Sequence, residues 1–254
     1  MTTAWPKHIE QYREYASWEC KDLPVDLVLA IIEHESGGIA GDQAKVKCKA
    51  AILPTAGGGK INVNRALGLM QVIPPNIAAW NEQGGEQVFF EDMTGSDERS
   101  IRLQIRLGCW ILASSFRGLN KFYPAAFPTA SGGEADPNQV QCALVGYAVG
   151  VGALREKFDA LKAEGKPLTY AQLRVSFPNW GKSKKTGKWI NRPLHYAEVV
   201  WNEYAKHIGG KKIDTKPPGL KDKVVKAWSS GGWLLIPVAA AALWAMSHGK
   251  AAAE

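Results

Sequence analysis

The sequence lacks the patterns that are typical of metalloproteins, all-β proteins and repeat proteins. Its four cysteines and five histidines show no metal-ligand spacing, so we expect no metal site and no cofactor. Alternating strand patterns are few and short, and no internal repeat is evident, which argues against all-β and solenoid folds. Cys109 and Cys142 lie among apolar residues of predicted helices and are expected to be buried thiols.

The chain also lacks a secretory signal and a long uninterrupted apolar run. Met1 to His8 contain no basic region followed by an apolar core. The apolar core Trp233–Met246 has fourteen residues, about 21 Å of helix against a hydrocarbon layer of about 30 Å. Adding Trp228–Gly232 gives the required length, and tryptophan at both ends of the core is typical of interfacial anchoring. We predict a hydrophobic helix at 227–247 that contacts a membrane through residues 228–246, or else packs against a protein partner.

The net charge of +7 is concentrated in two segments. Residues 181–192 carry five positive charges and no acid, and residues 209–226 carry six lysines against two aspartates. Basic runs of this kind can attract an anionic cell wall or anionic lipid headgroups. They lack the interleaved aromatic residues of a nucleic-acid-binding module, so no specific nucleic acid is expected as a partner. The predicted organisation is a domain at 1–208, a basic linker at 209–226, the hydrophobic helix at 227–247 and a tail at 248–254.

Apolar residues recur with the period of an α-helix over most of the first 208 residues. The predicted helices cover roughly 7–20, 24–36, 74–82, 97–119, 138–158, 169–176 and 193–208. The basic stretches 45–49 and 57–60 contain glycine and lysine and are predicted to form a flexible loop. The fold class is therefore mainly α.

Glu35 is the candidate catalytic residue. It lies three and four positions from apolar residues of the helix 25–36, so one helix face carries Val28, Ile31, Ile32 and Glu35. Glu33 and His34 are predicted to face away from that stripe, with Glu33 in water. A carboxyl group among apolar neighbours is costly to ionise, which raises its pKa and suits a general acid. The glycines at 37–38 should end the helix directly after this residue.

Four segments together resemble the soluble lytic transglycosylase family, glycoside hydrolase family 23, to which goose-type lysozyme is related. Glu35-Ser36 is followed by Gly68-Leu69-Met70-Gln71 within 66–75, as in the family's Glu-Ser and Gly-Leu-Met-Gln signature. The segment 143–152 is similar to the family's Tyr-Asn-x-Gly helix, and 195–200 to its late Tyr-Val motif. A supporting match is the segment 105–112. The resemblance covers about residues 20–208, with the motifs in the family's order.

The resemblance implies a lysozyme-like fold and a peptidoglycan lytic transglycosylase that cleaves the β-1,4 bond between N-acetylmuramic acid and N-acetylglucosamine. Glu35 would protonate the leaving oxygen and then act as base, while the muramyl 6-hydroxyl closes a 1,6-anhydro ring. Substrate contacts are implied for Ser36, Gly68, Met70, Gln71, Tyr147 and Tyr196. For Tyr147 and Tyr196 the helical spacing of their apolar neighbours equally predicts packing in the core.

The sequence departs from the family at several positions. Ala148 stands where the family usually has Asn, which removes one polar contact expected in the sugar site. Arg192-Pro193 replace the usual Glu-Thr ahead of Tyr196, and thirty-two residues separate Glu35 from Gly68, more than the family's usual spacing. These changes bear on substrate preference more than on the reaction.

Two other functions stay open. Asp42, the only other acid between Glu35 and Gly68, could activate water in a muramidase that hydrolyses the same bond. The second is a structural virion or membrane protein that only binds glycan, which the loss of a polar contact at Ala148 would allow. If residues 228–246 anchor the chain in a membrane, the lysine-rich flank would keep the catalytic domain on the cytoplasmic side, away from peptidoglycan. We therefore expect a phage virion-associated enzyme, with virion proteins as partners, that opens the host cell envelope in the periplasm for genome entry; the alternative is a bacterial inner-membrane-anchored enzyme.

Overall fold

The computed structural model describes residues 3–41, 47–83, 86–128, 136–178, 180 and 193–209. These residues form helices joined to one small antiparallel hairpin, so the prediction of a mainly α fold is confirmed. The elements are α1 (Lys7–Glu10), α2 (Arg13–Glu19), α3 (Val25–Ser36), β1 (Lys47–Pro54), β2 (Lys60–Arg65), α4 (Pro74–Glu82), α5 (Phe90–Thr94), α6 (Glu98–Phe122), α7 (Pro137–Val149), α8 (Val151–Ala163), α9 (Tyr170–Ser176) and α10 (Pro193–Ile208).

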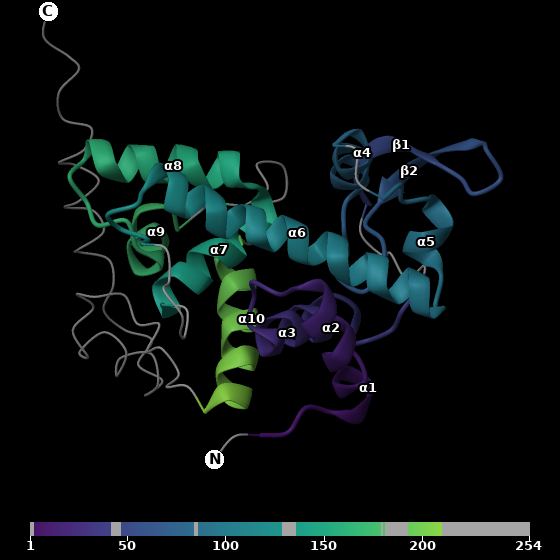
Figure 1. Cartoon of the computed structure of the whole chain (residues 1–254). Helices are drawn as coiled ribbons and strands as arrows, with labels where there is room; N and C mark the ends of the chain where they lie inside the picture. The colour runs from purple at the N-terminus through teal and green to yellow at the C-terminus, as the bar shows by residue number, and fades with distance from the viewer. Residues whose placement is uncertain are drawn as a thin grey trace, which may run out of the picture. The chain divides into compact units, whose positions relative to one another are not determined.

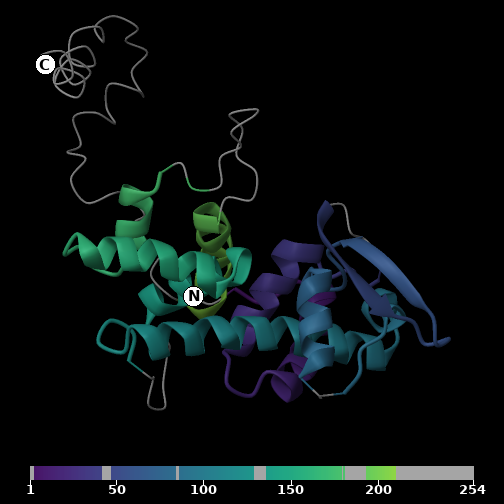
Figure 2. The ribbon, with the colours of Figure 1, turned by 90° about the horizontal axis from the view of Figure 1, so that it is seen from above.

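The long helix α6 organises the domain (Figure 1). Asp97 caps its first turn by accepting a hydrogen bond from the backbone N–H of Ser100 at 3.1 Å. The hairpin, α4 and α5 gather near the beginning of α6, and α8 lies along its later part (Figure 2). Helix α10 packs against both α3 and α7. Candidate site residues lie on all three of these helices.

Two groups of buried side chains form the core, and α6 contributes to both. The larger group joins α2, α3, α7, α8 and α10 through α6 residues such as Ile105 and Leu112. The smaller group lies under the hairpin and α4, where Leu53 and Val63 pack with Leu103 and Leu107 of α6. Burial of both groups fixes the hairpin to the helical part of the domain.

Two helices predicted as continuous are each broken. The predicted helix 138–158 divides into α7 and α8 at Gly150, whose φ of +88° is a conformation that side-chain-bearing residues rarely adopt. The predicted helix 7–20 divides into α1 and α2 around Gln11 and Tyr12, and the Tyr12 hydroxyl donates a hydrogen bond to the Gly38 carbonyl at 2.8 Å. Helix α5 was not predicted because its five residues are too few to show a helical period.

The prediction of a flexible basic loop at 45–49 and 57–60 is correct for residues 57–59, which form a turn, and wrong for residues 47–49 and 60, which belong to strands. Residues 47–54 and 60–65 pair as an antiparallel hairpin in which Leu53 faces Ile61 and Ile52 faces Asn62. The turn closes on Thr55, whose side chain accepts a hydrogen bond from the N–H of Gly59 at 2.9 Å. Only Leu53 and Val63 are fully buried, so the alternation is too sparse to predict strands from sequence.

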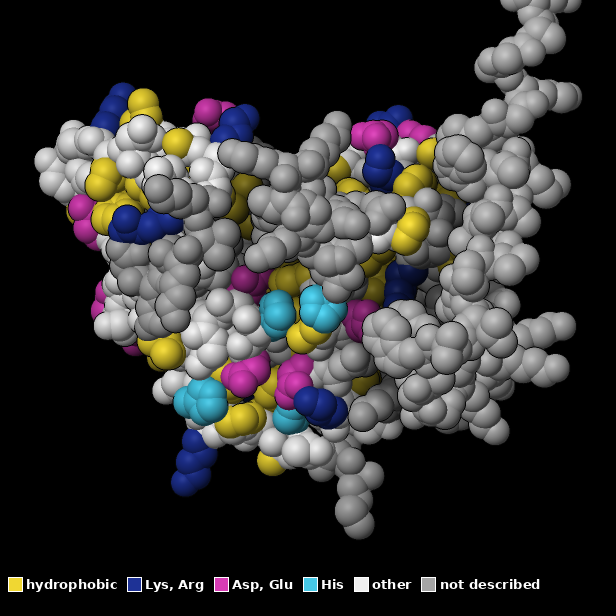
Figure 3. Space-filling model, turned by 180° about the vertical axis from the view of Figure 1, so that it is seen from behind, with side chains coloured by type: hydrophobic (Ala, Val, Ile, Leu, Met, Phe, Trp, Pro, Cys, Tyr) yellow, Lys and Arg dark blue, Asp and Glu magenta, His cyan; other side chains and the backbone are white. Residues whose placement is uncertain are grey.

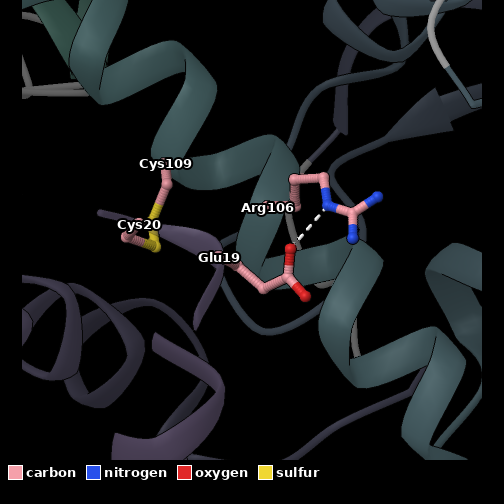
Figure 4. Close-up of a disulfide and its surroundings, with 4 residues drawn as sticks. All are labelled: Glu19, Cys20, Arg106 and Cys109. Carbon is pink, nitrogen blue, oxygen red and sulfur yellow. Dashed lines mark hydrogen bonds and ion pairs between the residues drawn. A yellow bond between two sulfur atoms is a disulfide. The ribbon is translucent and has the colours of Figure 1, made fainter. Parts of the chain in front are cut away.

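Cys109 is not a free thiol, because it forms a disulfide with Cys20 (Figure 4). The two cysteines are 89 residues apart, and sequence spacing cannot reveal a pair of this kind. The bond ties the end of α2 to α6, next to Glu19, which accepts from Arg102 at 2.7 Å and from Arg106 at 2.6 Å. Cys142 is a buried free thiol as predicted, and burial raises its pKa.

The hydrophobic helix predicted at 227–247 lies outside the described residues, as do the basic segments 181–192 and 210–226. In the part of the chain that is described, no helix is both long and apolar enough to cross a bilayer.

Candidate active site

Glu35 lies in the last turn of α3, where the sequence predicted it. Residues 27–32 of this helix are completely buried, among them Val28, Ile31 and Ile32 of the predicted stripe. Gly37 adopts φ +61° and its N–H bonds to the Glu33 carbonyl at 3.0 Å, so the glycine ends the helix as expected. The Glu35 carboxyl is thus held at the end of a rigid, buried helix.

Burial raises the pKa of Glu35 to about 7, and its interaction with the Tyr196 hydroxyl opposes part of that rise. An ordinary glutamate has a pKa of 4.5 and is ionised at neutral pH, whereas this carboxyl is about half protonated. A group in that condition can donate a proton and then take one back. The expectation of a raised pKa therefore agrees with the structure.

Two tyrosines lie against the Glu35 carboxyl from neighbouring helices. The rings of Tyr147 in α7 and Tyr196 in α10 stack with centroids 6.1 Å apart and planes 16° apart. The Tyr147 hydroxyl donates to the carbonyl of Met70 at 2.5 Å. Burial and the charge of Glu35 raise the pKa of both phenols, so both stay protonated donors at neutral pH.

The Tyr196 hydroxyl is buried beside Glu35 and forms no hydrogen bond of ordinary geometry with the described residues. An unpaired buried donor is costly, and such a group is available to bind a ligand or to complete a hydrogen bond with the carboxylate. Both tyrosines also pack against the main core. The two expectations for them, packing and a place beside Glu35, are compatible.

The loop 67–72 forms the other side of the assembly. Leu67 and Val72 exchange two backbone hydrogen bonds of 2.9 and 2.8 Å, which closes a tight turn. Gly68 has φ +74°, and a Cβ there would lie 2.7 Å from the side chain of Gln104. Gln71 has φ +46° and is the only described non-glycine residue with a positive φ. Its side-chain amide donates a hydrogen bond to the Gly68 carbonyl at 3.0 Å.

Gln104 of α6 holds this loop and was not predicted as a site residue. Its side-chain oxygen accepts from the N–H of Leu69 at 3.0 Å, and its nitrogen donates to the carbonyls of Asp92 at 3.1 Å and Gly95 at 2.8 Å. The residue is completely buried with both ends of its amide paired. In the sequence, the only indication of this role is that Gln104 is a polar residue one helical turn before Gly108, among apolar residues.

The Met70 side chain does not line a cleft, which corrects the expectation of a side-chain contact with substrate. It is completely buried, and it packs so closely on Gly108 of α6 that a Cβ at that glycine would clash with it. Met70 contributes instead through its carbonyl, which receives the Tyr147 hydroxyl. Soft, unbranched methionine fills the narrow space over a glycine.

His34 is exposed, in agreement with its predicted place off the Glu35 stripe, but its ring contacts a site residue, which was not predicted. Its ring lies edge-on to the Tyr196 ring, with centroids 5.0 Å apart and an angle of 75°. Burial and the neighbouring His195 lower the pKa of His34. Figure 3 shows histidine side chains side by side on this face of the molecule, near acidic and hydrophobic ones. His34 and His195 each precede a site residue, which was the only signal in the sequence.

The opposite face of α3 is partly covered, so Glu33, whose side chain is 33% exposed, faces water only in part. Asp26 accepts hydrogen bonds from Trp5 and Arg13, both at 2.8 Å. The Glu33 carboxylate lies 3.4 Å from the His8 ring nitrogen. The N-terminal residues therefore pack over this face, and Glu33 remains separated from Glu35 by the body of the helix.

A family model of the transglycosylase SLT domain matches residues 15–168, which include the site residues above except His195 and Tyr196 of α10. The chain belongs to this family. A comparison with curated proteins found no match. Members of the SLT family are lytic transglycosylases, which supports an enzyme that cleaves peptidoglycan.

Two further residues of the SLT domain, each next in sequence to a site residue, have known surroundings. The Ser36 hydroxyl donates to the Ile32 carbonyl at 3.0 Å, so its oxygen lone pairs remain to accept a hydrogen bond. Ala148, where the family usually has Asn, is exposed at the end of α7 directly after Tyr147. Its methyl group offers no polar contact there.

The remaining candidates cannot be placed in this SLT domain. Asp42 and Arg192 lie outside the described residues, while Pro193 begins α10. No three histidine, cysteine or acidic side chains within the described ranges are grouped to hold a metal ion.

Proposed function

We propose that this SLT domain cleaves the β-1,4 bond between N-acetylmuramic acid and N-acetylglucosamine and leaves a 1,6-anhydro-muramyl end. The observation that carries the proposal is the single carboxyl of Glu35, with a pKa of about 7, beside two protonated tyrosines. A reaction that needs an acid and later a base can use one group if its pKa lies near the working pH.

The protons balance through Glu35 alone. Protonated Glu35 gives its proton to the glycosidic oxygen as the bond from the muramyl C1 breaks, and the substrate's N-acetyl group stabilises the developing positive charge. The carboxylate then removes the proton of the 6-hydroxyl as its oxygen bonds to C1. Glu35 ends protonated, so no water and no second carboxylate is consumed.

The site residues support these steps by position. The buried Tyr196 hydroxyl interacts with Glu35 and can stabilise the carboxylate between the two proton transfers. Tyr147 fixes the Met70 carbonyl and, through it, the loop that presents Gln71. Ser36 and Gln71 are the side chains we assign to sugar contact, with the Gly68 backbone allowing the turn.

Ala148 provides the observation for a second candidate, a domain that binds glycan without cleaving it, because the polar group usual at this exposed position is missing. Hydrolysis by a muramidase is the third outcome, and it would require a group such as Asp42 to activate water.

The experiment is digestion of purified peptidoglycan by the full chain, followed by mass spectrometry of the released fragments. Anhydro-muramyl ends support the proposal, reducing ends indicate hydrolysis, and no release indicates binding alone. Glu35→Gln should lose activity by at least the 10²–10⁴-fold that general acid catalysis commonly contributes. Glu33→Gln, from the other side of α3, is the matched control and should retain it.

We further propose that the enzyme is delivered with a phage virion to the host envelope, where opening the wall would permit genome entry. The support is the sequence of the basic segment 209–226 and the apolar segment 228–246. An antibody to the chain should label purified virions; label confined to the bacterial inner membrane would favour the anchored enzyme.

A further inference from the structure

Two neighbouring cavities lie on one side of α6, with volumes of about 520 and about 210 Å³, and Arg106 lines both. Arg99 and Arg102 line the larger cavity, and Trp80 and Trp110 line the smaller. We call this combined surface the α6 groove.

The α6 groove lies on the far side of the helix from the Glu35 site. Gly108 of α6 faces Met70, whose carbonyl belongs to that site. Arg106 and Trp110 are each two positions from Gly108, which places them about 200° around the helix. The groove is therefore separate from the substrate contacts assigned above.

The three arginines of the groove are paired with two carboxylates, and the oppositely charged Lys21 and Asp22 and the acid Glu98 also line it. Glu19 accepts from Arg102 and Arg106, while Glu86 lies 2.9 Å from Arg99 and 2.7 Å from Arg106. Because each guanidinium faces a carboxylate, the groove offers fixed donors and acceptors with little uncompensated charge. This favours a neutral polar ligand over an anion.

Indole rings lie next to these hydrogen-bonding groups. Trp80 and Trp110 meet edge to face with centroids 5.6 Å apart. The indole N–H of Trp80 donates a hydrogen bond to the backbone carbonyl of Glu86 at 2.8 Å. Trp18, 45% exposed, lies under the Arg102 guanidinium at 5.6 Å. A pyranose ring has an apolar C–H face and a rim of hydroxyls, and flat indoles beside paired polar groups match both.

We propose that the α6 groove is an accessory site for neutral sugar residues of a glycan strand. That the strand is peptidoglycan rests on the proposed function. A second contact on the same polymer makes rebinding intramolecular and lengthens the stay of the enzyme on an insoluble wall.

The test measures co-sedimentation of the full chain with insoluble peptidoglycan, using Glu35→Gln so that the polymer stays intact. Adding Trp18→Ala and Trp110→Ala should weaken the apparent Kd about tenfold, equivalent to about 1.4 kcal/mol. Val175→Ala, an exposed apolar residue of α9, is the control and should bind as its parent. Trp18→Ala alone, at an exposed position, should show part of the loss if the pair does not fold.

Competition identifies the ligand class. Soluble β-1,4 oligomers of N-acetylglucosamine should reduce the tryptophan-dependent binding, and inorganic phosphate should not. Unchanged binding by Trp18→Ala and the pair, or competition by phosphate alone, would overturn the proposal. Cleavage of short soluble fragments by the chain with Glu35 intact tests the proposed function separately. Absence of cleavage with tryptophan-dependent binding retained would overturn that function and leave the accessory site standing.

Discussion

Replacing Glu35 with Gln should stabilise the folded protein at pH 8 while it abolishes cleavage. Burial penalises the ionised carboxylate, so the folded domain holds the proton of Glu35 more tightly than the unfolded chain does. Glutamine has nearly the same shape and is neutral at every pH. The substitution therefore removes the cost of ionisation and keeps most of the packing.

The size of the effect follows from the two pKa values. The difference between about 7 in the folded domain and 4.5 in the unfolded chain, at 1.36 kcal/mol per pKa unit, is about 3 kcal/mol. Stability from the protonated form is fully present below pH 4.5, declines as the pH rises toward 7 and is lost above it. The variant should gain almost nothing over wild type at pH 4 and about 3 kcal/mol at pH 8.

Urea denaturation of the full chain at both pH values, with the disulfide oxidised, measures the difference. Glu33→Gln removes a carboxylate from the other face of the same helix and controls for general charge effects. A difference between Glu35→Gln and wild type that does not change with pH would refute the reasoning, as would a less stable variant at pH 8. Either result would mean that the Glu35 carboxyl is well solvated in the folded domain.

Tyr196→Phe removes the interaction that lowers the pKa of Glu35, so the alkaline limb of the activity profile should move to higher pH; an unchanged limb would show that the two groups do not interact. Tyr147→Phe should reduce turnover with the melting temperature within a few degrees, and a large fall in stability with full activity per folded molecule would assign this residue to packing alone. Cys20→Ser opens a covalent loop of about 90 residues and should lower the unfolding free energy by about 4.5 kcal/mol in denaturation under oxidising conditions, matching wild type under reduction. Leu235→Asp should release the full chain from anionic vesicles in a flotation assay, because a charge inside a membrane helix costs about 3 kcal/mol; wild-type chain that never binds vesicles would favour a protein partner instead.

Features that depend on a single helix could be predicted from the sequence. The apolar stripe of α3 predicted the burial that raises the pKa of Glu35, and the glycines after it predicted the end of the helix. The prolines at the start of α4 occupy its first turn, where their missing N–H groups cost nothing. Each of these follows from local geometry along a few consecutive residues.

Features that need two distant segments were not predictable in this way. The disulfide joins residues 89 apart, and the Tyr147–Tyr196 stack depends on how α7 meets α10. The contact of His34 with Tyr196 was not predicted because helical spacing gives the direction of a side chain but not the residue of another helix that it meets. The partial covering of Glu33 has the same origin, since His8 of the N-terminal segment lies beside it.

The disulfide also determines what happens to the domain if a protease cuts it. The turn of the hairpin, at residues 56–60, is exposed and lies between Cys20 and Cys109. A cut there would separate the backbone segment bearing Glu35 from the one bearing Tyr147 and Tyr196, yet the two fragments would stay joined through sulfur. Nicked protein would then run as one species on a non-reducing gel and as two after reduction, with Glu35, Tyr147 and Tyr196 still held in one covalent molecule.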